Sequence, residues 1–154
     1  MDSIMLSDGS AAEQIFSALS NFCPFRGRTP GEIQLADCLG RLIRVSAALT
    51  SFPDGAALLV NADEARPPVP PLDRAHLLLT YGCHPKATLT ASSITDDRLI
   101  CCLQRTLSWN SLPPILPQEF SVPRNGQPVS ALLGAICILL LTFGESFFSF
   151  ENEE

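Results

Sequence analysis

The sequence has little positive charge and few of the side chains that carry acid–base chemistry. Its 154 residues include ten Lys and Arg residues against sixteen Asp and Glu residues, which gives a net charge of −6. Proteins that bind nucleic acids neutralise phosphates with Lys and Arg, so this balance argues against nucleic acid as a partner. The chain has only two histidines, His76 and His84, which leaves few candidates for general acid–base catalysis. The sequence therefore favours a non-enzymatic protein.

The spacing motifs of metal sites and export signals are also missing. The six cysteines are irregularly spaced, without a Cys-x-x-Cys or His-x-x-x-His pair, which structural zinc sites normally show. The weak candidates for a metal site are His76, Cys83, His84 and Cys101, whose predicted strand and turn positions explain them equally well, so no cofactor is predicted. The first ten residues contain two aspartates and no basic residue, unlike a secretory signal. We therefore expect a cytoplasmic protein with reduced thiols.

Apolar residues make up 46% of the chain and charged residues 17%, which is enough apolar material for the core of one domain. Ser10 and Glu13 form a capping-box pattern that predicts a first helix ending near Asn21. The sequence Thr29-Pro30-Gly31-Glu32 resembles a second helix start, followed by leucines at helical spacing up to residue 50. The two segments together predict an N-terminal helical hairpin.

The middle of the chain carries short apolar runs separated by turn residues, which is typical of β-strands. Such runs lie at residues 57–60, 76–81, 87–94, 98–104 and 119–122. The runs at 76–81, 87–94 and 98–104 follow one another at close spacing, which fits consecutive antiparallel hairpins. We therefore expect an antiparallel β-meander of about four strands. A C-terminal apolar helix over 129–143 is expected to pack on this sheet. The predicted fold class is α+β, with one domain over residues 1–144 and an aromatic, acidic tail over residues 145–154.

The uncharged run that follows Pro128 allows two interpretations. Extended to residue 150, it has about the twenty residues that a membrane-spanning helix needs, which would make the chain a tail-anchored membrane protein with a cytosolic domain over residues 1–128. The apolar run over 129–144 is shorter than that requirement, however, and Glu145 interrupts its extension. We therefore predict a buried core helix and keep the membrane anchor over residues 129–150 as the alternative.

These features predict a small intracellular, non-enzymatic protein-binding module of the adaptor, regulator or chaperone-like kind. The expected partner is another protein, or a second copy in a homodimer, bound through the exposed sheet face or the helical hairpin. An enzyme with an unrecognised site is a further alternative. The candidate partner-binding residues are Arg41, Arg44, Phe147, Phe148 and Phe150.

Overall fold

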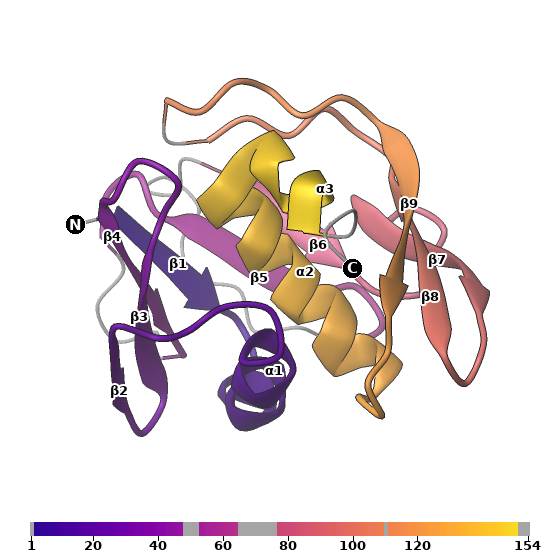
Figure 1. Ribbon diagram of the computed structural model, residues 1–154, viewed down its shortest axis with the longest axis horizontal. Coiled ribbons are helices and arrows are strands. Elements are labelled where there is room, and N and C mark those ends of the chain that lie inside the picture. The colour runs from indigo at the N-terminus through magenta and orange to yellow at the C-terminus, as the bar shows by residue number, and fades with distance from the viewer. Residues whose placement is uncertain (1, 48–52, 65–76, 110, 151–154) are drawn as a thin grey trace.

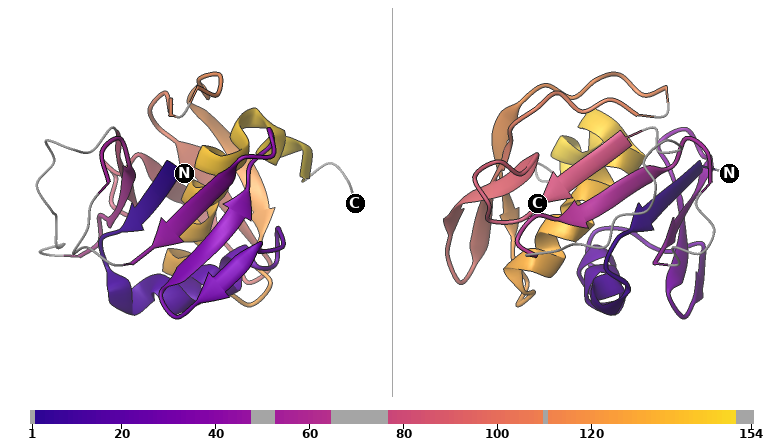
Figure 2. Two further views of the ribbon diagram at one scale, coloured as in Figure 1. Left: turned by 90° about the vertical axis from the view of Figure 1, so that its left-hand side faces the viewer. Right: turned by 180° about the vertical axis from the view of Figure 1, so that it is seen from behind.

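The protein is built around one nine-stranded mixed β-sheet with its helices on one face (Figures 1 and 2). The computed structural model describes residues 2–47, 53–64, 77–109 and 111–150. The strands are β1 (Asp2–Leu6), β2 (Gly27–Thr29), β3 (Glu32–Ala36), β4 (Leu42–Ser46), β5 (Ala57–Asn61), β6 (Leu77–Tyr81), β7 (Leu89–Ile94), β8 (Arg98–Leu103) and β9 (Gln118–Pro123). The helices are η1 (Gly9–Ala11), α1 (Ala12–Leu19), α2 (Val129–Phe143), η3 (Gly144–Ser146) and α3 (Phe147–Phe150).

The centre of the sheet is parallel and its two sides are antiparallel. The spatial order is β2-β3-β4-β1-β5-β6-β7-β8-β9. Strand β1 lies between β4 and β5 and is parallel to both, and β5, β6 and β7 continue in the same direction. Strands β2, β3 and β4 pair antiparallel on one side, as do β7, β8 and β9 on the other. The parallel centre brings the carboxyl ends of several strands to one edge.

The predicted helical hairpin is wrong, because the segment expected to form its second helix contains the last residue of β2 and all of β3 and β4. Gly31 has a φ of +77° in the turn between β2 and β3, a conformation that glycine adopts without steric cost. The Asp37 carboxylate accepts hydrogen bonds from the backbone N–H of Leu39 and Arg41 in the next turn. The leucines that suggested helical spacing are therefore divided between strands and a turn.

The four-stranded antiparallel meander is also wrong, although the predicted strand segments are present and the α+β composition holds. The hairpins β7–β8 and β8–β9 are antiparallel, but β5, β6 and β7 run parallel. The parallel pairing explains why β5 reads as a continuous apolar run, since strands in parallel sheets are buried on both faces. Strand β1 was not predicted, because Ile4, Met5 and Leu6 are too few to show a periodic pattern.

Helix α1 begins close to its predicted position but with a different cap. The Asp8 carboxylate accepts hydrogen bonds from the backbone N–H and the hydroxyl of Ser10, at 3.0 and 2.6 Å. The Glu13 carboxylate forms an ion pair with Arg28 on β2 and accepts a hydrogen bond from the Gly31 backbone N–H at 3.3 Å. The capping box of Ser10 and Glu13 is therefore absent, and Glu13 links α1 to the β2–β3 hairpin.

Helix α2 is present as predicted and is buried against α1 and the central strands. Gly134 allows a close approach, since a Cβ atom there would lie 2.9 Å from Ile15 Cδ1 and 3.3 Å from Tyr81 Cζ. The segment Val129–Ser149 is long and apolar enough to cross a membrane, and 78% of its most apolar window is buried within the protein. This property is shared by core helices and membrane anchors, so the location of the protein in the cell stays a prediction.

Candidate site at the carboxyl ends of the central strands

Polar side chains gather where β1, β5 and β6 end. Strand β1 leads into Ser7 and Asp8, β5 ends at Asn61 and leads into Asp63 and Glu64, and β6 leads into Cys83 and His84. The three strands are parallel neighbours, so these residues share one edge of the sheet. Ligands of open sheets with parallel strands bind outside the carboxyl ends of the strands, which makes this edge the candidate functional site.

The Asp63 carboxylate connects the segment after β5 to the segment after β6. Its two oxygens accept hydrogen bonds from the backbone N–H groups of Cys83 and His84, at 2.9 and 3.0 Å. The backbone N–H of Asp63 in turn donates to the Asn61 side-chain oxygen at 2.9 Å. A Cβ atom on Gly82 would lie 2.8 Å from the Asp63 carboxylate. Residue 82 must therefore be glycine for the carboxylate to sit this close to the backbone.

Asp8 and Glu64 form a carboxyl pair that connects the ends of β1 and β5. Hydrogen bonds from the Ser10 hydroxyl and the Glu64 carboxyl lower the pKa of Asp8. The same bond to Asp8 raises the pKa of Glu64, and desolvation and the charge of Asp8 add to this effect. When the pair holds a single proton, that proton therefore lies on Glu64 and not on Asp8. Ser7, next to Asp8, is 2% exposed, and its hydroxyl has no hydrogen-bond partner within the described part of the chain.

The N-terminus of α2 and the ring of Tyr81 complete this edge. The Asn61 side-chain nitrogen lies 3.3 Å from the Ser130 hydroxyl in the first turn of α2. The buried Tyr81 hydroxyl has a raised pKa, mainly because of burial, with further contributions from Cys137, Asp8, Glu64 and Asp63. The charges of the three carboxylates therefore add to the effect of burial on this hydroxyl.

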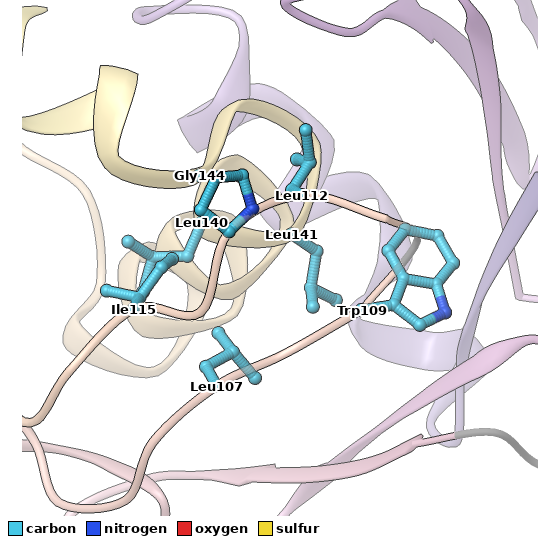
Figure 3. Close-up of a pocket in the computed structure, with 8 residues that line it drawn as sticks. Leu107, Trp109, Leu112, Ile115, Leu140, Leu141 and Gly144 are labelled. Carbon is cyan, nitrogen blue, oxygen red and sulfur yellow. The ribbon is translucent and has the colours of Figure 1, made fainter.

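The opposite end of the central strands is closed by apolar packing. Trp109 is 5% exposed, and its indole N–H donates to the Gly55 carbonyl at 3.2 Å, two residues before β5 begins. Figure 3 shows Trp109 and Leu107 lining a small pocket together with Leu140 and Leu141 from the end of α2. Paired backbone hydrogen bonds between Leu107 and Ile115 hold this loop in shape. The amino ends are therefore covered by hydrophobic side chains.

The candidate metal-site residues are only partly brought together. Cys83 and His84 lie side by side in the chain at the polar edge, whereas Cys101 is fully buried on β8 and His76 lies outside the described residues. Partial burial and the charge of Asp63 raise the pKa of the Cys83 thiol, which lowers its reactivity at neutral pH. Within the described ranges, no group of three or more His, Cys, Asp and Glu side chains is arranged to hold a metal ion.

The candidate partner-binding residues do not form one surface. Arg41 pairs with Asp37 in the β3–β4 turn at 2.8 Å, and Arg44 lies 3.5 Å from Glu32 across the β3–β4 pair. Phe147, from the predicted tail, is fully buried. Phe148 is partly buried against Phe120. The side chain of Phe150 lies outside the described residues.

The polar residues after β5 were missed by sequence reasoning. Asn61, Asp63 and Glu64 follow directly after a buried apolar run, a signal that points to a site only if the strand is parallel to its neighbours. The prediction assumed antiparallel hairpins, in which consecutive strands end at opposite edges.

Comparison with protein-family models, with curated proteins and with solved structures found no match to this chain.

Proposed function

We propose that the protein is a non-enzymatic binding module whose ligand site lies at the carboxyl ends of β1, β5 and β6. The observation that carries the proposal is the convergence of Asp8, Asp63 and Glu64 from two parallel strands beside the loop after β6. Carboxylates accept hydrogen bonds and attract positive charge. The ligand class that fits is therefore a small polar molecule that donates hydrogen bonds from hydroxyl or ammonium groups.

The site combines fixed and available acceptors. Asp63 is held by two backbone N–H groups, which orient its carboxylate. Glu64 is bonded mainly to another carboxyl group, that of Asp8. A ligand donor placed between Asp8 and Glu64 would relieve the repulsion between the two carboxylates when both are ionised. Binding is therefore expected to be strongest at a pH at which both carboxylates are ionised.

Isothermal titration calorimetry on the full chain tests the proposal with three probes. Putrescine supplies ammonium donors, glucose supplies hydroxyl donors, and succinate is the anionic comparison. We expect putrescine or glucose to bind and succinate not to bind, and the one that binds identifies the kind of donor. Heat from neither donor probe, or tighter binding of succinate, would overturn the proposal.

Two variants, each of which replaces one carboxylate with a neutral amide, test where the probe binds. Glu64→Gln is expected to weaken binding of the donor probe by about ten- to a hundredfold, because a hydrogen bond to a charged group contributes roughly 1.5–3 kcal/mol. Asp97→Asn, in the exposed turn between β7 and β8, is the matched control and should bind as the wild type does. Equal weakening by both variants would show that binding follows net charge and not this site.

A second candidate function is the protein-binding role, with a second copy of the chain as partner. The observation that favours it is Leu78, which is 44% exposed on the helix-free face, while its pairing neighbour Leu58 on β5 is fully buried. Strands at the centre of parallel sheets are usually covered on both faces, whereas the helices of the described residues all lie on the other face of this sheet (Figure 2). Self-association would bury it.

Sedimentation velocity over a range of concentrations tests the second candidate. Leu78→Glu is expected to abolish dimer formation, because the new charge would have to be buried in the interface. Leu39→Glu is the control, since Leu39 is 64% exposed in the turn between β3 and β4. A wild-type protein that stays monomeric at all concentrations would contradict self-association and leave the ligand site as the proposed function.

A further inference from the structure

We draw no further inference here: the strongest candidate, the small apolar pocket between the end of α2 and residues 107–115, belongs to the packing that already closes the amino ends of the central strands.

Discussion

The two ends of the central parallel strands differ in chemistry although the same strands form both. At the carboxyl ends, Asp63 and Glu64 follow β5 and remain partly or fully exposed. At the amino ends, the buried Trp109 packs beside the start of β5, and its indole N–H donates a hydrogen bond to the Gly55 carbonyl. Helix α2 touches both ends, with Ser130 at the polar edge and Leu141 in the apolar packing.

Under the proposed function, the amino end serves stability and the carboxyl end serves binding. Apolar burial contributes about 25 cal/mol per Å², so the amino end, with its buried indole and leucines, stabilises the fold. The loops at the carboxyl end are held in shape by hydrogen bonds to the exposed Asp63 carboxylate, and such bonds contribute less to stability. Substitutions at the amino end should therefore alter unfolding, and substitutions at the carboxyl end should alter ligand binding.

The largest expected effect is at Trp109. Trp109→Ala should lower the free energy of unfolding by about 3–5 kcal/mol, because it removes a buried indole from the packing against α2. Trp109→Phe keeps an aromatic ring and loses the bond to Gly55, so it should cost less, about 0.5–1.5 kcal/mol. Urea denaturation followed by far-ultraviolet circular dichroism measures both. Equal losses of unfolding free energy in the two variants would show that packing of the aromatic ring contributes nothing to stability.

A smaller effect on the free energy of unfolding is expected at Gly82, together with weaker binding of the donor probe. Gly82→Ala places a Cβ atom against the Asp63 carboxylate at a φ of +142°, which should cost about 1–3 kcal/mol and weaken the donor probe. Gly126→Ala is the control, because Gly126 has a φ of +74° but open space around it. If both variants bind the probe as the wild type does, contact with Asp63 is unimportant for the site.

The smallest expected effect is the pH dependence caused by Glu64. A raised pKa in the folded protein means that its stabilising contribution is present below the ordinary value of 4.5 and is lost as pH rises through the raised value. Glu64→Gln stays neutral and keeps an uncharged partner for Asp8. The variant should therefore match the wild type near pH 4 and be more stable than it at pH 7, as measured by thermal unfolding.

The pH experiment has a matched variant on β9. Glu119→Gln removes an exposed carboxylate far along the sheet from Asp8. Its unfolding temperature relative to the wild type should not follow the same pH curve. A stability difference for Glu64→Gln that is constant between pH 4 and pH 7 would mean that the carboxyl pair does not share a proton.

The sequence predicted local elements better than their arrangement. Helix α2 and the strand segments from β5 to β9 are visible as apolar runs between turn residues, because burial of a continuous segment depends on local composition. The pattern from residue 29 to 50 was ambiguous, since leucines that fit a helix also fit two strands separated by the Asp37 turn. Gly31 and Gly40, both at positive φ, were the local signals for turns.

Strand direction could not be predicted from the same runs. Strand β6 runs parallel to β5 and to β7, although only residues 82–88 separate β6 from β7. A connection this short favours an antiparallel hairpin. The candidate site was missed for the same reason, because Asp8 and Glu64 are 56 positions apart in the sequence and meet only when both strands end at one edge.

The most direct test of the account is chemical-shift mapping of the ¹⁵N-labelled full chain during titration with putrescine and with glucose. The single tryptophan gives one indole N–H signal that reports on the amino end. The account predicts that the probe that binds shifts the backbone amides of Cys83, His84 and Glu64 and leaves the Trp109 indole signal in place. Shifts centred on the indole signal, or an absence of shifts at the three amides, would contradict a binding site at the carboxyl ends of the strands.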